Sequence, residues 1–368
     1  MKKLLALLFA VCVLSSCSNS SEPIEPEARR VVLVYMEAKN NLSSKADDDL
    51  GEMLRGSVPE DCRLLVFLST YGRAPRLMEV KNSSLVPLLE YEDGVSAVDP
   101  KHLKRVVADA ARLAPAKERG LVFWSHAFGW QQNVRRSRAF GWENSSHTMS
   151  NTELADALEG AGLDYIYFDA CFMGSVEVAY ELRHAADYLV ASPAETPADG
   201  MPYDLTIPAL FANDIPAGLI ETIDIVADYY DENPNVAGGC PRTLSLINLR
   251  EMELLATETK RIVALGNSPA EDFVPQQYVS LTTYPSNAYR NRFFDLEQWA
   301  DAIGADSRWH EAMNGAVVYE RHSSMIWNST PLVNCCGLSV FIPNETYDFN
   351  SFGYSTLQWP QFVYNINP

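Results

Sequence analysis

Short apolar runs alternate with segments of helical periodicity along most of this chain. The clearest run covers residues 165–168 and ends in Asp169-Ala170-Cys171, and from Val176 apolar positions recur as on one face of a helix. This pattern predicts a buried strand that leads directly into a helix. Similar runs predict strands at 30–36, 63–69, 120–124 and 188–192, and similar periodicity predicts helices at 45–56, 100–114 and 151–160. The alternation is typical of an α/β protein with three layers and a mostly parallel central sheet.

The second half of the chain continues with a higher share of helix. Periodicity predicts helices at 216–231, 249–266, 293–303 and 307–320, and strands at 243–247 and 337–342. No segment between residues 30 and 345 has the composition of a linker, so we expect one domain there. Residues 346–368 are aromatic and aperiodic, and we expect an irregular segment packed on that domain.

The amino terminus has the pattern of an export signal. Lys2 and Lys3 precede an apolar stretch of residues 4–14, which is too short to span a bilayer. The stretch ends in Leu-Ser-Ser-Cys, which resembles a bacterial lipobox. We therefore expect a signal peptide over 1–17, lipidation of Cys17 and a flexible tether over 18–29, which would anchor the protein in the bacterial cell envelope, at the outer membrane or cell surface.

Charge and cysteine content narrow the possible partners. The chain has 29 basic and 48 acidic residues, which disfavours nucleic acid as a partner. The acidic balance suits a basic substrate, and it equally suits a soluble acidic surface. The seven cysteines form no Cys-x-x-Cys pair, so we expect no zinc site. We expect a monomer.

Two residues that can carry catalysis follow predicted strands. His126 comes just after the strand at 120–124, and Cys171 comes just after the run at 165–168. If these strands are neighbours, both residues lie at the carboxyl edge of the sheet, where ligands bind in open α/β folds. A histidine can take the proton of a thiol and return it to a leaving amine. A following helix amino terminus would lower the pKa of the Cys171 thiol.

Four stretches of the chain resemble the clostripain family of cysteine peptidases. They are Tyr-Met followed by Asn-Asn-Leu in 35–42, Trp-Ser-His-Ala-Phe-Gly-Trp at 124–130, Asp-Ala-Cys-Phe-Met-Gly-Ser-Val-Glu at 169–177, and Cys-Gly-Leu-Ser-Val-Phe-Ile-Pro at 336–343. The stretches occur in the family's order and span nearly the whole mature chain. The resemblance implies a caspase-like α-β-α sandwich, related to gingipain, legumain and separase, and a cysteine endopeptidase that cleaves proteins or peptides.

The resemblance also implies catalytic roles for matching positions. His126 would be the general base and then the general acid, and Cys171 would be the nucleophile. The N–H groups of Cys171 and Ala127 would form the oxyanion hole. The family usually has glycine at the position of Ala127. Because alanine resists positive φ, we expect a loop conformation that alanine allows.

The family mostly cleaves after Arg or Lys, which implies an acidic pocket for the substrate. Asp169 matches the family's acid, and alternation along an extended segment places it on the same side as Cys171. An alternative is that Asp169 only caps a backbone turn. The loop at 192–203 departs from the family's Ser-Glu-Glu, and Asp199 is the candidate second acid.

Three further expectations come with the resemblance. Family members can cut themselves between the histidine and the cysteine, where this chain has Arg135, Arg136 and Arg138; an exposed basic loop without that role is the alternative. Calcium is a candidate cofactor, but the sequence offers no recognisable site for it. The alternative to an active peptidase is a catalytically impaired, caspase-like surface lipoprotein that binds peptides or glycans.

Overall fold

The computed structural model describes residues 27–131, 140–143, 147–278, 292–327, 330–344 and 347–367. The predicted signal peptide, Cys17, most of the tether and the three arginines at 135–138 lie outside the described residues. Within them, no helix is long and apolar enough to cross a membrane.

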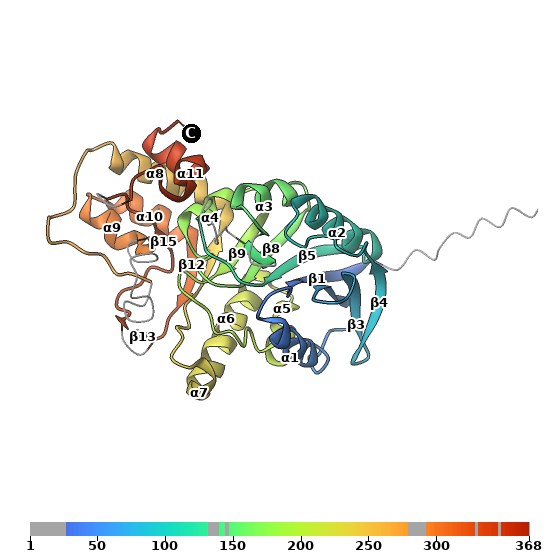
Figure 1. The fold of residues 1–368 in the computed structure, drawn as a ribbon. Coiled ribbons are helices and arrows are strands. Elements are labelled where there is room, and N and C mark those ends of the chain that lie inside the picture. The colour runs from blue at the N-terminus through green and yellow to red at the C-terminus, as the bar shows by residue number, and fades with distance from the viewer. Residues whose placement is uncertain are drawn as a thin grey trace, which may run out of the picture.

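A central sheet of nine strands, counted over the described residues, organises the molecule (Figure 1). Its order is β12-β10-β9-β8-β5-β1-β2-β3-β4. The strands are β1 (Ala28–Glu37), β2 (Cys62–Ser69), β3 (Arg76–Lys81), β4 (Ser84–Glu90), β5 (Ala116–Trp124), β8 (Leu163–Asp169), β9 (Ala186–Ala191), β10 (Leu244–Asn248) and β12 (Val317–Arg321). The five central strands β2, β1, β5, β8 and β9 are parallel, and antiparallel strands complete both sides. The predicted mostly parallel α/β sheet is confirmed.

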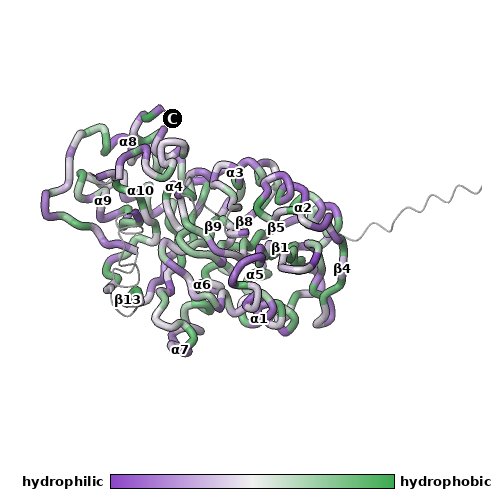
Figure 2. The backbone as a smooth tube through the Cα atoms, viewed as in Figure 1, coloured by the Kyte–Doolittle hydropathy of each residue, from purple (hydrophilic) through white to green (hydrophobic). Residues whose placement is uncertain are grey.

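Helices cover both faces of this sheet. Alternate residues of β1 separate into two cores: Val31, Leu33 and Tyr35 face one core, and Val32, Val34 and Met36 face the other. One core contains residues of α2 (Pro100–Leu113), α3 (Asn151–Leu158), α4 (Val176–Glu181) and α8 (Met252–Val263), and the other contains residues of α1 (Ser43–Met53), α5 (Tyr203–Leu210) and α6 (Ile215–Glu232). Figure 1 shows these two sets on opposite sides of the strands. Hydrophobic segments gather at the strands between them (Figure 2).

The remaining described elements are short. They are β6 (Phe140–Glu143), β7 (His147–Met149), α7 (Pro234–Ala237), η1 (Leu249–Glu251), β11 (Phe294–Asp295), α9 (Leu296–Ala302), α10 (Ser307–Ala316), β13 (Met325–Ile326), β14 (Thr330–Pro331), β15 (Ser339–Val340), η2 (Ser351–Thr356) and α11 (Gln358–Tyr364). The strand expected at 337–342 is reduced to β15, which pairs with β11 outside the central sheet.

Two further sequence expectations differ from the structure in the second half. The helix expected over 307–320 ends at Ala316, and the chain continues as β12, which pairs with β10 at the sheet edge. Residues 346–368 were expected to be irregular, but they include the helix α11, which packs against α4 and α8. Aromatic side chains such as Trp359, which is fully buried, hold this helix on the domain. The domain boundaries themselves stay a prediction.

Candidate active site

The register between β5 and β8 brings His126 and Cys171 to the same edge of the sheet. The two strands are parallel neighbours, and Trp124 is paired with Asp169. His126 and Cys171 each lie two residues beyond this pair, so the chain delivers them side by side at the carboxyl ends of adjacent strands. The arrangement expected from the sequence is present.

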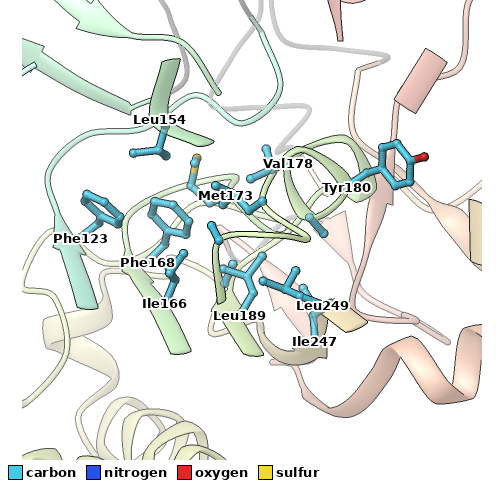
Figure 3. Close-up of a cluster of buried hydrophobic side chains, with 14 of the residues drawn as sticks. Phe123, Leu154, Ile166, Phe168, Met173, Val178, Tyr180, Leu189, Ile247 and Leu249 are labelled. Atoms are coloured by element: carbon cyan, nitrogen blue, oxygen red, sulfur yellow. The ribbon is translucent and has the colours of Figure 1, made fainter. Parts of the chain in front are cut away.

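The loop that carries Cys171 is held firmly from both sides. The N–H groups of Phe172 and Gly174 donate to the carbonyl oxygens of Ala194 (2.8 Å) and Ser192 (2.7 Å), in the loop after β9. Met173 is fully buried, and Figure 3 shows it among apolar side chains of β5, β8, β9, α3 and α4. This packing fixes the backbone on either side of the nucleophile candidate.

The thiol of Cys171 lies against Thr196. The N–H of Thr196 donates to Sγ at 3.4 Å, and Oγ1 of Thr196 is 3.7 Å from Sγ. Burial raises the pKa of Cys171 to about 11, and the contacts with Thr196 oppose this only in part. The expectation that a helix amino terminus lowers this pKa is therefore wrong. The helix α4 has only six residues and begins after its cap Ser175, so desolvation dominates.

The imidazole of His126 is oriented by two neighbours. Its Nε2 lies 2.7 Å from Oδ1 of Asn41, and its ring meets the edge of Trp142 at a centroid distance of 5.3 Å. An amide oxygen only accepts hydrogen bonds, so Nε2 carries the proton and Nδ1 is the free base. Burial lowers the pKa of His126, which keeps the ring neutral and able to accept a proton near pH 7.

In this structure the two catalytic candidates bond to other partners. Among the described residues, Sγ of Cys171 contacts Thr196 and Nε2 of His126 contacts Asn41, with no hydrogen bond between thiol and imidazole. Catalytic hydrogen bonds are often long in free enzymes and tighten when substrate binds.

Ala127 adopts a backbone conformation that alanine tolerates. It is absent from the described residues with positive φ, and it forms a bridge with Phe140. The positive φ of this loop falls on Gly129, at +66°, where an added Cβ would approach the carbonyl oxygen of Phe172 to 2.7 Å. The change from glycine to alanine at 127 is therefore compatible with this loop. The oxyanion hole itself stays a prediction.

The carboxylate of Asp169, at the end of β8, accepts hydrogen bonds from two neutral groups among the described residues. The N–H of Met201 and the hydroxyl of Tyr203 donate to its Oδ2 at 3.0 and 3.1 Å. Burial raises its pKa to about 6, and these hydrogen bonds limit the rise. Asp169 thus holds a backbone turn, as the alternative interpretation expected, and it also presents a charge with no ion-pair partner among the described residues.

A second carboxyl group, that of Asp49, also lies against Gly200. A Cβ added at Gly200 would be 2.9 Å from Oδ2 of Asp169 and 3.1 Å from Oδ2 of Asp49. Burial, and then the charge of Asp169, raise the pKa of Asp49 to about 9, while Nε1 of Trp124 donates to it at 2.6 Å. The sequence reasoning missed Asp49. Its spacing from Ala46 and Met53 on the buried face of α1 is the signal that could have found it.

Asp199 is already engaged by a cation. Nζ of Lys45 lies 2.5 Å from Oδ1 of Asp199 and 3.8 Å from Asp48. Glu195, which follows Ala194, accepts a hydrogen bond from Nε1 of Trp327 and is nearly buried. Asp199, the predicted second acid, precedes Gly200, and Gly200 lies against Asp169. The carboxylate of Asp199 is paired with Lys45, a partner that the sequence did not suggest.

The described residues contain no group of three or more His, Cys, Asp or Glu side chains placed to hold a metal ion.

Comparisons with known proteins find cysteine proteases that resemble this chain. Clostripain from Hathewaya histolytica is 26% identical over 216 residues, which cover 47% of this chain and 40% of that protein. A secreted C11 cysteine protease from Bacteroides thetaiotaomicron, solved with an irreversible peptide inhibitor, is 27% identical with a TM-score of 0.76, covering 91% of this chain and 99% of that one. An inactive zymogen C11 protease from Parabacteroides distasonis, at 24% identity, has the same fold with a TM-score of 0.77 over 92% of this chain and 98% of that one.

The family match extends over most of the chain, from the end of β1 to α11. It covers residues 34–362 and includes both His126 and Cys171. The chain belongs to the clostripain family of cysteine peptidases.

Proposed function

We propose that this protein is a cysteine endopeptidase that cleaves after Arg or Lys through Cys171 and His126. The observation that carries this proposal is the equal offset of the two residues beyond the paired positions Trp124 and Asp169 on adjacent parallel strands. The inhibitor-bound relative from Bacteroides thetaiotaomicron supports a peptide as the bound substrate.

The chemistry proceeds in two stages. Nδ1 of His126 takes the thiol proton, and the sulfur of Cys171 attacks the scissile carbonyl carbon. The N–H groups of Cys171 and Ala127 stabilise the resulting oxyanion. The imidazolium then gives its proton to the leaving amine, which departs and leaves a thioester. Water, deprotonated by His126, attacks the thioester and releases the carboxylic acid product and the thiol.

Selection of a basic residue rests on Asp169. Its charge has no described ion-pair partner and lies two residues before the nucleophile, whereas Asp199 is paired with Lys45. A substrate guanidinium or ammonium would supply the missing positive charge. The test is turnover of matched peptides with Arg, Lys or Ala before the scissile bond. Cleavage of the basic peptides alone supports the proposal. Binding of peptides or glycans without turnover would favour the impaired lipoprotein.

Replacing Lys45 with methionine is expected to improve the use of basic substrates. The variant removes a positive charge next to Asp199, so kcat/KM for an Arg peptide should rise about threefold to tenfold, mainly through a lower KM. The matched control is Lys104→Met, which removes an exposed lysine on α2. Unchanged or lower kcat/KM in Lys45→Met would show that Lys45 does not compete with the substrate's charge.

Self-processing is proposed after Arg135, Arg136 or Arg138, between His126 and Cys171 in the sequence. Purified wild-type protein should convert to two fragments on a denaturing gel, while Cys171→Ala stays a single band. A variant with all three arginines changed to glutamine should also stay intact and remain a folded protein. A single band in the wild type and in Cys171→Ala alike would exclude self-processing.

We propose further that the chain is anchored in the bacterial cell envelope through lipidated Cys17 and acts there as a monomer. The lipobox-like pattern before Cys17 supports this proposal. Metabolic labelling with a fatty acid analogue, compared between wild type and Cys17→Ser, tests it.

A further inference from the structure

Glu37, the last residue of β1, is a fully buried carboxylate that gathers hydrogen bonds from three separate segments. Its Oε1 accepts from the N–H of Lys39 at 3.0 Å. Its Oε2 accepts from Nδ2 of Asn40 (2.9 Å), Oγ of Ser125 (2.7 Å) and the N–H of Trp142 (3.1 Å). Four donors on one carboxylate exceed what a single turn or cap requires.

Each of these donors belongs to a segment that contacts His126. Asn40 precedes Asn41, whose amide oxygen lies 2.7 Å from Nε2 of the imidazole. Ser125 precedes His126 in the chain. Trp142 places its ring against the imidazole at 5.3 Å. Glu37 itself does not appear among the hydrogen-bond partners of His126, so its influence passes through these three neighbours.

Further contacts stabilise the same arrangement around Glu37. Nζ of Lys39 lies 3.1 Å from Oε1 of Glu143, which belongs to the same short strand as Trp142, and Oγ of Ser96 donates to Glu143. The loop 38–42 and the strand β6 are thereby tied together on one side of the imidazole. Glu37 adds a link that these contacts do not make, because its carboxylate joins both segments to Ser125, the residue before His126.

We infer that Glu37 is a positioning residue that holds Asn41, Ser125 and Trp142 around His126 and so fixes the direction in which the imidazole presents its free nitrogen. The inference rests on the proposed Cys-His mechanism. The carboxylate is fully buried, so it is not available to bind a substrate itself. It accepts hydrogen bonds from buried donors of the loop 38–42, of Ser125 and of β6. Without these hydrogen bonds the donors would have to move to other acceptors, and the segments that surround His126 would shift.

The test compares Glu37→Gln and Ser125→Ala with a matched control. Gln keeps the shape of the side chain but has only one acceptor oxygen. A neutral amide oxygen at the position of Oε2 accepts more weakly than a carboxylate from Asn40, Ser125 and Trp142, and the amide nitrogen cannot accept from the N–H of Lys39, so the hydrogen bonds are weakened while the fold is retained. Ser125→Ala removes one donor next to His126. The control is Glu79→Gln, which weakens a mostly buried ion pair with Arg63 at the far side of the same sheet.

With an Arg peptide, kcat of Glu37→Gln should fall about tenfold while KM stays near the wild-type value, because the substrate pocket is untouched and only the base is displaced. Ser125→Ala should also lower kcat and leave KM unchanged, but its fall in kcat should be smaller. Glu79→Gln should lower the melting temperature and leave kcat unchanged. Wild-type kcat in folded Glu37→Gln, or an equal loss of kcat in the control, would overturn the inference.

A second readout does not need activity. The imidazole of His126, assigned by its loss in His126→Gln, should titrate by NMR below the ordinary histidine pKa in the wild type, because it is buried. In Glu37→Gln its pKa should move back toward the ordinary value as Asn41 and Trp142 loosen. An unchanged titration would contradict the positioning role. Absence of turnover in the wild type would instead contradict the proposed function and leave this measurement decisive for Glu37.

Discussion

Cys171→Ala is expected to abolish peptidase activity while leaving the fold intact. The variant removes the sulfur that forms the thioester, and the remaining site can only polarise the substrate. The rate should therefore fall by at least about 10⁴-fold. The measurement is turnover of an Arg fluorogenic peptide, with circular dichroism and thermal unfolding as the check of the fold.

Cys62→Ala is the matched control for this experiment. Cys62 is also a free cysteine, but it is buried at the amino end of β2, whereas Cys171 is partly exposed beyond the carboxyl end of β8. Its removal should leave turnover unchanged. An equal loss of turnover in both variants, or turnover at the wild-type rate in Cys171→Ala, would contradict the assignment of Cys171 as the nucleophile.

The raised pKa of Cys171 adds a dependence on pH. With a pKa of about 11 in the substrate-free protein, the thiol is almost entirely protonated near pH 7, so a small reagent such as iodoacetamide should label it slowly. Labelling should accelerate as pH rises toward that value. A peptidyl chloromethyl ketone with Arg should label faster at neutral pH, since it occupies the site and brings the thiol proton to His126.

The parts of this molecule that local pattern determines were predictable from the sequence. The run at 165–168 is apolar on both sides because β8 is buried between two helical layers, and that property identified the strand and its terminal cysteine. The periodicity of α2 and α6 identified helices in the same way. The residues that carry the chemistry follow such strands directly, so the sheet edge could be inferred without knowledge of the register.

What the sequence could not supply depends on contacts between distant segments. Asn41 meets His126, Lys45 meets Asp199 and Thr196 meets Cys171 across 85, 154 and 25 positions, respectively. No local spacing encodes those encounters. The strand β12 was missed for a related reason, since Val317 continues the helical pattern of α10 and becomes extended only through pairing with β10.

The thiol shows how such contacts can reverse a local argument. Proximity to a helix start favours a thiolate, but Cys171 is only partly exposed and lies against Thr196 in the loop after β9, so burial opposes the charged form. Desolvation outweighs the dipole of a six-residue helix, so the reactive form depends on His126. In the proposed mechanism a protonated thiol needs a well-placed base, and this is the reason for testing the positioning role inferred for Glu37 beside Asn41 and His126.

Asp169→Asn is expected to remove the preference for basic residues. Asparagine can still accept from the N–H of Met201 and the hydroxyl of Tyr203, so the turn at 201–203 should persist while the charge is lost. An unsatisfied guanidinium near a neutral amide should lower kcat/KM for an Arg peptide by about 10²- to 10³-fold, with little change for an Ala peptide. Asp164→Asn, on the same strand but at its opposite end, is the matched control and should keep the preference for Arg.

The pH profile distinguishes this charge from the catalytic base. Binding a basic side chain requires the ionised form of Asp169, whose pKa of about 6 lies above the ordinary value for aspartate. Charge-dependent binding is therefore complete above pH 6 and is lost as pH falls through that value. The wild type should show a fall in kcat/KM for the Arg peptide centred near pH 6, and Asp169→Asn should lack it. Protonation of His126, whose pKa burial lowers, affects both proteins alike, so the difference between the two profiles reports Asp169. An identical acid limb in wild type and Asp169→Asn would show that another group recognises the basic residue, and Asp49, which also lies against Gly200, would be the first to replace.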